Sequence, residues 1–298
     1  MSVRFRIAPD ERGRVDKVIG RRYPAAGRRA LARMFRAGRV RIDGAVAKKG
    51  DLVSDGAEVQ LDFEPGADAT VVAEDNPAVT CIYEDDDLVA LNKLAGMASH
   101  PLAQGELGTA ANVIVARYPE CAGASDDPRE AGLVHRLDTF TSGVLVAARN
   151  AEAWRAARQL FSDKAVDKTY LALVAGKVNE PGSCNEHLSR TGSHVSVVVQ
   201  GLAARTDWQV VENFADYTLV RCTTHHGRRH QVRVHLAHAG HPIAGDSQYG
   251  GPTLVGLKGQ FLHGDSVKLP HPVSGEELLL QAPLAPEQEA LLESLRSA

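Results

Sequence analysis

Residues 135–147 read His-Arg-Leu-Asp-Thr-Phe-Thr-Ser-Gly-Val-Leu-Val-Ala, a polar turn that leads directly into an apolar run. The turn residues and the run that follows predict a loop anchored on a buried β-strand, with Asp138 at the mouth of that strand. Such a loop suits a catalytic group, because the scaffold fixes the side chain and leaves it accessible. The simpler alternative is an aspartate that accepts backbone N–H groups in a tight turn.

Three other apolar runs, at residues 88–91, 170–174 and 219–222, have the length of buried strands. A helix is expected directly after residues 135–147, with Asn150 as its N-cap. Because strands and helices do not alternate regularly, the pattern favours an α+β fold over a doubly wound sheet. The expected helix has its apolar face at Trp154, Ala157, Leu160 and Phe161.

A different pattern precedes this region. Leu31, Met34 and Phe35 are spaced to share one face of a helix. Residues 40–44, Val-Arg-Ile-Asp-Gly, alternate and end in a hairpin turn signal, and residues 59–63 alternate again. The sequence therefore predicts a small module of helix and hairpin.

Boundaries follow from composition. Residues 64–77 combine acidic residues with turn formers and lack periodicity, so we expect a linker there. The small module then ends at residue 63, and a second domain covers residues 78–298.

Charge is distributed unevenly along the chain. Residues 1–50 hold 15 Lys and Arg against 4 Asp and Glu, a net charge of +11, whereas the remainder holds 19 against 33, a net charge of −14. A basic module joined to an acidic body indicates a polyanionic partner. A solvated basic surface is the alternative.

Several classes of protein are not indicated. The first ten residues contain no apolar stretch of signal-peptide length, and no segment approaches eighteen apolar residues, so we expect a cytoplasmic protein with no membrane partner. The four cysteines are scattered and form no C-x-x-C pair, which argues against a disulfide framework and a zinc-cysteine site. They are Cys81, Cys121, Cys184 and Cys222.

Residues 80–285 resemble the RluA-type family of pseudouridine synthases. His-Arg-Leu-Asp, two residues and Thr-Ser-Gly at 135–143 match the family signature, Lys168-Thr169-Tyr170 fits its Lys-x-Tyr element, and residues 227–235 fit Gly-Arg-x-His-Gln-φ-Arg-x-His. His226 and Arg229 replace two threonines that are usual there, which predicts a difference in how the RNA backbone is held. The resemblance implies the pseudouridine synthase fold, a mixed, mainly antiparallel sheet with flanking helices.

The resemblance also implies an isomerase that detaches uracil from ribose and rejoins it through carbon, with no cofactor and no metal. Asp138 would act as a nucleophile at C1′ or assist deprotonation at C2′. Arg233 would keep Asp138 ionised and oriented, and Tyr170 would stack on uracil and take part in proton transfer. Arg136 would fill the gap left by the flipped uridine. Further substrate contacts are expected at His135, Arg228, His230 and Gln231.

Residues 12–63 resemble the S4 RNA-binding domain, with Arg-Val-Asp at 14–16 before a first helix and Gly-Arg-Val at 38–40 entering a strand. In this family such a module implies ribosomal RNA of the large subunit, with transfer RNA as the alternative, and a monomer is expected. The module would hold structured RNA through phosphate contacts. Its expected RNA-binding residues are Arg28, Arg29, Arg33, Arg36, Arg39 and Arg41.

Two other functions fit parts of the sequence. Six histidines lie between residues 225 and 241, and His226 and His230 have helical i, i+4 spacing, which allows a metal-dependent hydrolase with Asp138 as a further ligand. The absence of an H-E-x-x-H motif argues against that function. The other candidate is a non-catalytic S4-type RNA-binding protein with a retired synthase domain. The sequence keeps Asp138, Tyr170 and Arg233 together, which argues against this candidate.

Overall fold

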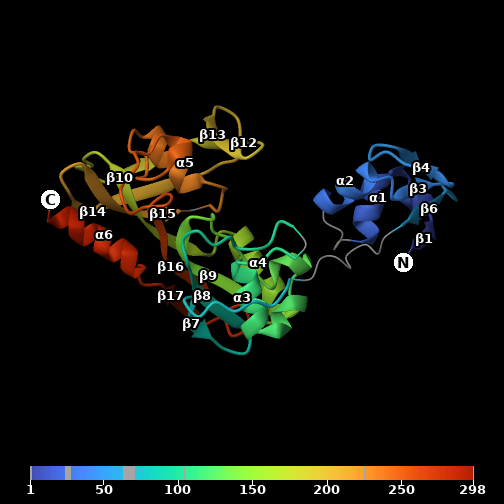
Figure 1. The fold of residues 1–298 in the computed structure, drawn as a ribbon, viewed down its shortest axis with the longest axis horizontal. Coiled ribbons are helices and arrows are strands. Elements are labelled where there is room, and N and C mark those ends of the chain that lie inside the picture. Colours follow the sequence, from blue (N-terminus) through green and yellow to red (C-terminus); the bar gives the residue numbers. More distant parts are fainter. Residues whose placement is uncertain (1, 24–27, 63–70, 104, 225, 298) are drawn as a thin grey trace.

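The computed structural model describes residues 2–23, 28–62, 71–103, 105–224 and 226–297, and the side chains of residues 28–30 and 33 lie outside the description. Figure 1 shows a small N-terminal body, drawn in blue, and a larger body formed by the rest of the chain. None of the described helices is long and apolar enough to cross a membrane.

The small body is built on a four-stranded antiparallel sheet. In spatial order its strands are β1 (Val3–Arg6), β6 (Glu58–Leu61), β3 (Val40–Ile42) and β4 (Ala45–Val46). A 3-10 helix (Pro9–Glu11), the strand pair β2 (Gly13–Arg14) and β5 (Leu52–Val53), and the helices α1 (Val15–Arg22) and α2 (Arg28–Arg36) complete it. Because β1 pairs with β6, the sheet begins before residue 12, at which the predicted module starts.

The predicted hairpin and helix face are both present in the small body. The strands β3 and β4 are joined by Asp43 and Gly44, whose φ angles of 48° and 82° suit the two-residue turns that connect antiparallel strands. Leu31, Met34 and Phe35 of α2 are buried in the core of this body. Their spacing therefore correctly identified the inward face of the helix.

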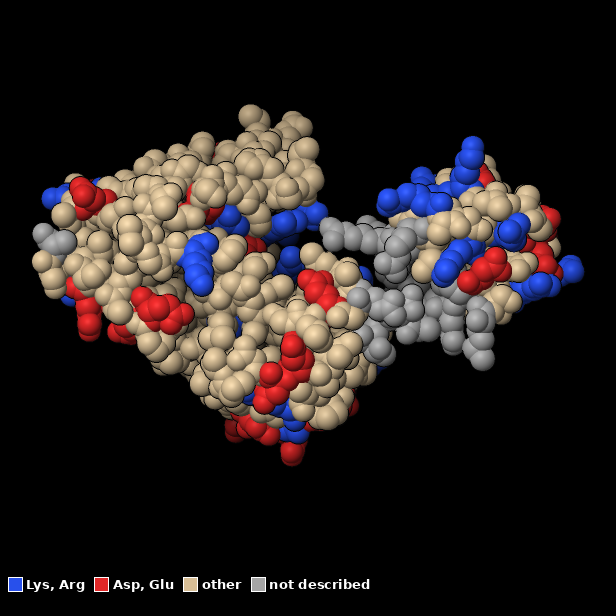
Figure 2. Space-filling view, viewed as in Figure 1, with Lys and Arg blue, Asp and Glu red and all other residues tan. Residues whose placement is uncertain are grey.

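The predicted RNA-binding arginines fall in two groups. Arg36 and Arg39 are exposed, and Arg41 is half-exposed. Figure 2 shows Lys and Arg side chains spread over the surface of the small body. The other three, Arg28, Arg29 and Arg33, have backbones in α2 and side chains outside the described set.

The larger body is built on a nine-stranded sheet. Its path runs β11-β14-β15-β10-β16-β9-β8-β7, and β17 pairs with β16. Its ladders are antiparallel except for that between β9 and β16, which confirms a mixed, mainly antiparallel sheet. The strands are β7 (Thr80–Glu84), β8 (Leu88–Lys93), β9 (Thr141–Ala148), β10 (Asp167–Ala175), β11 (Gly182–Cys184), β14 (Thr206–Asn213), β15 (Tyr217–Thr224), β16 (Leu262–Pro270) and β17 (Glu277–Gln281).

The four predicted strands of this body lie within β8, β9, β10 and β15. A separate hairpin, β12 (His187–Thr191) and β13 (His194–Val198), projects beside the sheet (Figure 1). The helices of the larger body are α3 (Ala110–Arg117), α4 (Ala151–Ser162), α5 (Gln231–His238) and α6 (Pro286–Arg296). The 3-10 segments are Pro119–Gly123, Pro128–Glu130 and Ser247–Tyr249.

Helix α4 forms as predicted. The Asn150 side chain accepts a hydrogen bond from the backbone N–H of Ala153 at 2.9 Å, as an N-cap residue does. Trp154 and Ala157 are buried against the sheet, and Leu160 and Phe161 are partly buried in the same cluster.

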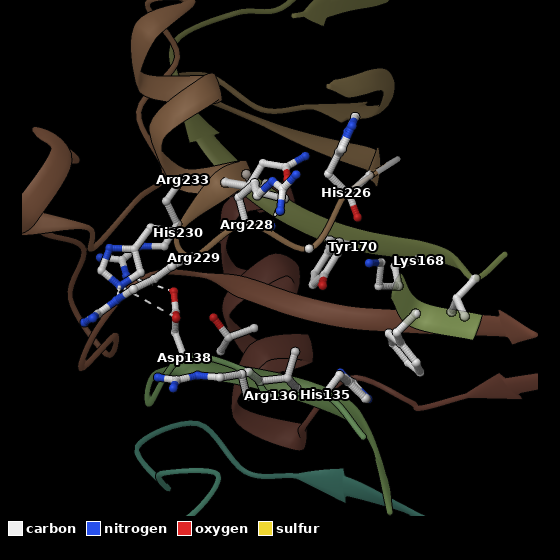
Figure 3. Close-up of a pocket in the computed structure, with 18 of the residues that line it drawn as sticks. His135, Arg136, Asp138, Lys168, Tyr170, His226, Arg228, Arg229, His230 and Arg233 are labelled. Atoms are coloured by element: carbon white, nitrogen blue, oxygen red, sulfur yellow. Dashed lines mark hydrogen bonds and ion pairs between the residues drawn. The ribbon is translucent and has the colours of Figure 1, made fainter. Parts of the chain in front are cut away.

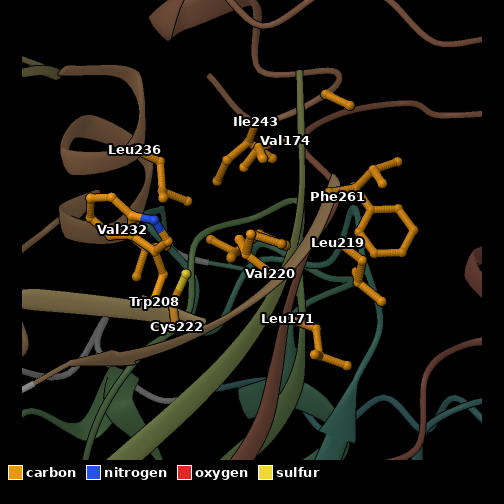
Figure 4. Close-up of a cluster of buried hydrophobic side chains, with 14 of the residues drawn as sticks. Leu171, Val174, Trp208, Leu219, Val220, Cys222, Val232, Leu236, Ile243 and Phe261 are labelled. Carbon is orange, nitrogen blue, oxygen red and sulfur yellow. The ribbon is translucent and has the colours of Figure 1, made fainter. Parts of the chain in front are cut away.

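A hydrophobic cluster fixes α5 on the sheet (Figure 4). Val232 and Leu236 of α5 belong to the same buried cluster as Trp208 of β14 and Val220 and Cys222 of β15. Each large side chain buried in this way stabilises the fold by about 1.5–3 kcal/mol. The cluster therefore holds rigidly the helix that carries Arg233.

The described part of the predicted linker, residues 71–77, packs on the larger body. Val71 is buried, and Asn112 of α3 donates its side-chain amide to the carbonyl of Val72 at 2.7 Å. Arg117 donates to the carbonyl of Asn76 at 2.8 Å. These tertiary contacts hold an irregular segment that composition alone marked as a spacer.

The close parallel pairing of β9 and β16 depends on Gly143. Its φ of 111° is unfavourable for residues with a side chain, and a Cβ at this position would overlap the backbone of Gly264 in β16. We expect Gly143→Ala to lower the free energy of unfolding by about 2–6 kcal/mol, because backbone strain and overpacking each cost about 1–3 kcal/mol and both apply here. Urea denaturation measures this change.

The control for this variant is Gly192→Ala, in the turn between β12 and β13. Gly192 has a φ of 62°, but a Cβ there would meet nothing within 4 Å. The control should therefore lose only about 1–2 kcal/mol, the cost of a left-handed backbone for L-residues. Equal losses in the two variants would contradict the close approach of β9 and β16.

Candidate active site

A cavity of about 550 Å³ opens in the larger body (Figure 3). Its walls come from the loop before β9, from β10, and from the turn that leads into α5. The cavity brings together every site residue predicted for this body: His135, Arg136, Asp138, Tyr170, Arg228, His230, Gln231 and Arg233. Segments almost a hundred residues apart in sequence therefore meet at one place.

The loop that carries Asp138 is held from both sides. Ser99 donates its hydroxyl to the carbonyl of Leu137 and accepts from the N–H of the same residue, at 2.8 and 3.0 Å. On the other side, Gly96 donates its N–H to the carbonyl of Thr139 at 2.9 Å. The backbone next to Asp138 is thus fixed, as expected for a loop anchored on β9.

A buried lysine also holds this loop. Lys93 of β8 donates to the carbonyls of Leu94, Met97 and Thr139 at 2.9, 2.6 and 3.2 Å. Burial lowers the pKa of Lys93 to about 7, while the nearby Asp138 opposes that change. Lys93 therefore ties two loops together beneath Asp138.

The Asp138 carboxylate points at Arg233. Arg233 Nη1 lies 3.0 Å from Asp138 Oδ2, and the Asp138 side chain remains 20% exposed toward the cavity. The backbone carbonyl of Asp138, not its side chain, closes the turn, by accepting from the N–H of Thr141 at 3.0 Å. This geometry favours a functional carboxylate over the turn-stabilising aspartate that the sequence left as an alternative.

A second carboxylate orients Arg233 from behind. Arg233 Nε and Nη2 donate to the two oxygens of Asp246 at 2.6 and 2.8 Å, a bidentate pair that fixes the plane of the guanidinium. Burial disfavours the charge of Arg233, but the hydrogen bonds and the charges of Asp246 and Asp138 outweigh burial and raise its pKa. The guanidinium also lies over the Tyr249 ring, 5.0 Å from its centroid.

His230 flanks the same carboxylate without carrying a charge. Burial lowers the pKa of His230 to about 4, with Arg233 and Arg229 acting in the same direction and Asp138 opposing them. Arg229 Nε donates to His230 Nε2 at 3.2 Å, so the ring proton resides on Nδ1, 2.7 Å from the hydroxyl of Tyr249. The distance of 3.7 Å between His230 Nε2 and Asp138 is therefore a contact and not an ion pair.

Tyr170 of β10 lies in the cavity beside Asp138 (Figure 3). Burial raises the pKa of the Tyr170 hydroxyl, and the charge of Asp138 raises it further. The hydroxyl is therefore protonated at neutral pH, so it can donate a hydrogen bond or a proton. Its ring offers a flat surface for a planar group.

Two predicted substrate-binding residues have their polar atoms committed to the protein. His135 Nε2 accepts from the N–H of Val146 at 3.0 Å, and its ring stacks on Phe161. Gln231 donates to the carbonyl of Arg205 at 2.8 Å and accepts from the N–H of Arg228 at 3.1 Å. In the structure His135 and Gln231 form walls and brace the adjoining loops.

The other two predicted substrate-binding arginines, Arg136 and Arg228, have fewer contacts with the protein. Arg136 is exposed at the edge of the cavity, and within the described residues no carboxylate pairs with it. Arg228 donates Nε to the carbonyl of Ala203 at 3.1 Å and keeps the rest of its guanidinium on the cavity wall.

Sequence reasoning assigned no role to some residues of this site. Lys168 stood in a stretch that fitted the family pattern, so a signal was present for it, whereas Asp246 reaches the site only through its tertiary contact with Arg233. Arg190 of β12 also lines the cavity, and nothing in the local sequence marked it.

The histidine-rich stretch does not form a metal site in the described part of the chain. No group of three His, Cys, Asp or Glu side chains there is placed to hold an ion. The i, i+4 spacing of His226 and His230 is not helical, because His230 has a φ of 54° and α5 begins after it, at Gln231. His225 lies outside the described residues.

Comparisons with known proteins agree with one another. A family model described as RNA pseudouridylate synthase matches residues 87–238. The chain is 34% identical over 313 residues to ribosomal large subunit pseudouridine synthase D of Xanthomonas campestris pv. campestris, covering 99% of this chain and 93% of the relative. It is 36% identical over 297 residues to the protein of the same name from Nitrosomonas europaea, covering 95% and 85%.

Solved structures share the fold. Human RNA pseudouridylate synthase domain containing 4 matches with a TM-score of 0.57 and 24% identity, over 72% of this chain and 92% of that one. Human RNA pseudouridylate synthase domain containing 1 matches with a TM-score of 0.55 and 24% identity, over 79% and 98%.

Proposed function

Because the chain belongs to the RNA pseudouridylate synthase family, and so isomerises uridine to pseudouridine in RNA, we propose that Asp138 is its catalytic carboxylate. The observation that carries this proposal is the Arg233 guanidinium, which contacts Asp138 and Asp246 at once inside the cavity. A cation held in this way keeps the adjacent carboxylate ionised and aimed.

The arrangement suits both chemical routes to pseudouridine. In one, an oxygen of Asp138 bonds to C1′ as the bond from C1′ to N1 breaks. In the other, Asp138 takes the proton from C2′ while that same bond breaks. Both require an ionised carboxylate, and both require the uracil to turn within the cavity before it bonds again through carbon.

Tyr170 is placed to assist the base. Its ring would lie against the uracil, and its protonated hydroxyl would take part in the proton transfers that complete the new bond to carbon. The neutral His230 and the guanidinium of Arg228 complete the polar wall. We assign substrate contacts to these two residues, and a bracing role to His135 and Gln231.

A stacked uridine must leave its helix to enter the cavity, which costs a few kcal/mol. We propose that Arg136 offsets this cost by stacking where the base was and pairing with a phosphate. Its exposure at the edge of the cavity, without a carboxylate partner among the described residues, supports this role.

We infer that the RNA is large-subunit ribosomal RNA, because the relatives from Xanthomonas campestris and Nitrosomonas europaea are both named ribosomal large subunit pseudouridine synthase D. Transfer RNA is the alternative. We further propose that the protein acts as a cytoplasmic monomer and that its small body is the S4-like module that holds structured RNA. The exposed Arg36 and Arg39 and the half-exposed Arg41 support that last role.

We expect Asp138→Asn to abolish pseudouridine formation and to leave RNA binding nearly unchanged, because an amide can neither attack C1′ nor accept the C2′ proton. Release of tritium from ribosomal RNA labelled at uridine C5 measures the reaction, and filter binding measures affinity. Asp216→Asn, at an exposed position away from the cavity, is the matched control and should retain full activity. Full activity of Asp138→Asn would refute the assignment.

For the small body, we expect Arg36→Gln, Arg39→Gln and Arg41→Gln combined to weaken RNA binding and to flatten its dependence on salt. Each lost phosphate contact should reduce the slope of log K against log salt by roughly 0.7–1. The control replaces the exposed Lys177, Arg221 and Lys258 of the larger body with Gln. If both triple variants keep the wild-type slope, the small body does not contact the RNA backbone.

A further inference from the structure

Among the described residues that line the cavity, Lys164 and Lys168 are the two lysines, and of these only Lys168 is buried. The proposed chemistry has so far assigned no role to its ammonium group. Lys168 of β10 lines the cavity, and the residue is only 7% exposed. It lies two residues before Tyr170, so both side chains project from the same face of the strand. Figure 3 shows Tyr170 between Asp138 and Lys168 along the cavity.

Within the described residues no hydrogen-bond acceptor or carboxylate contacts the Lys168 ammonium. It lies 5.6 Å from the centroid of the Phe161 ring. A Cβ at Gly227 would come within 3.3 Å of Nζ, so the loop before α5 closes over the group. A charge that is largely removed from water is disfavoured unless a partner approaches it.

A second unpartnered polar group lies beside this ammonium. Thr224 faces Lys168 in the ladder between β10 and β15, and its hydroxyl is buried without a hydrogen-bond partner. Thr224 also lines the cavity. Two polar groups that both lack partners at the same end of a cavity indicate that their partner arrives with the substrate.

The position of Lys168 determines which part of the substrate supplies the missing partner. The polyanionic backbone of an RNA chain remains at the exposed edge, near Arg136, and only a flipped nucleoside reaches the interior. With ribose C1′ at Asp138 and the base against Tyr170, the far end of the base faces Lys168. The acceptors that uracil offers there are its carbonyl oxygens.

We propose that Lys168, assisted by Thr224, binds a carbonyl oxygen of the target uracil and stabilises the negative charge that the base acquires as it leaves ribose. The inference rests on the proposed function. When the bond from C1′ to N1 breaks, its electron pair stays with the base and spreads over the ring and its carbonyl oxygens. Lys168 transfers no proton in this step. Its positive charge stabilises the transition state, in which the base becomes negative, more than it stabilises the bound substrate.

The ammonium must be protonated for this role. Burial lowers the pKa of Lys168 to about 8, Arg228 lowers it further in the same direction, and Asp167 opposes the change. Lys168 is therefore charged below about pH 8 and loses its charge above it. The other titratable side chains that share this part of the cavity are His135, Arg158, Tyr170 and His226.

The test compares Lys168→Met, Lys168→Arg and Thr224→Val with wild type in single-site pseudouridine formation. For Lys168→Met we expect kcat to fall about 100-fold or more, the effect of removing a donor to a developing oxyanion, with little change in Kd for RNA. Thr224→Val should show a smaller loss of kcat. Lys177→Met, at an exposed position outside the cavity, is the control and should match wild type.

The pH profile provides a readout that a purely structural role would not move. In wild type and in Lys177→Met, kcat/KM should fall as pH rises through about 8. In Lys168→Arg that decline should shift upward by several pH units, because a guanidinium stays protonated, and this comparison remains decisive if Lys168→Met fails to fold.

Three results would overturn the inference while leaving the proposed function standing. The first is an active Lys168→Met enzyme with wild-type kcat. The second is an alkaline decline that is identical in wild type and Lys168→Arg. The third is a loss of RNA affinity in Lys168→Met with a flatter salt dependence and unchanged kcat, which would assign Lys168 to a phosphate. A wild-type enzyme that forms no pseudouridine would instead refute the proposed function itself.

Discussion

The arrangement of the site depends on a single guanidinium placed between two carboxylates. Arg233 is buried and forms a bidentate pair with Asp246 on one side and a third hydrogen bond with Asp138 on the other. A buried cation with one partner would leave charge uncompensated, whereas two carboxylates leave the group a single negative charge directed at the cavity. The planar fork of arginine makes this geometry possible, because its nitrogens diverge in one plane.

The fold is arranged to hold this constellation. Asp138 comes from the mouth of β9, where loops 94–99 and 137–139 are tied by Ser99 and Lys93. Arg233 comes from α5, which Val232 and Leu236 fix in the hydrophobic cluster over β14 and β15. The two halves of the sheet meet where β9 and β16 run parallel, and Gly143 permits their close approach. The core packing and the site geometry are thus parts of one structure.

Local features of this chain could be predicted from its sequence, and tertiary ones could not. The strand after Asp138, the N-cap at Asn150 and the buried face of α2 follow from periodicity and capping, which act over a few residues. The role of Asp246 could not be derived, because its partner lies thirteen residues away on α5 and only the fold brings them together. The i, i+4 spacing of His226 and His230 is not a helical one in the fold, because His230 has a left-handed backbone and α5 begins only at Gln231. Residues 71–77 looked like a spacer because contacts with α3 leave no trace in composition.

We propose that Asp138 acts only while Arg233 contacts both carboxylates at once. The decisive measurement is the rate of pseudouridine formation by Arg233→Lys compared with that of wild type. Thermal denaturation of both proteins checks that the variant is folded under the assay conditions. Lysine keeps the charge but cannot form the bidentate pair with Asp246 while reaching Asp138, so we expect kcat to fall at least about 100-fold, as when a preorganised charged donor is removed. A folded Arg233→Lys enzyme with a near wild-type rate would show that charge alone suffices and would contradict the account.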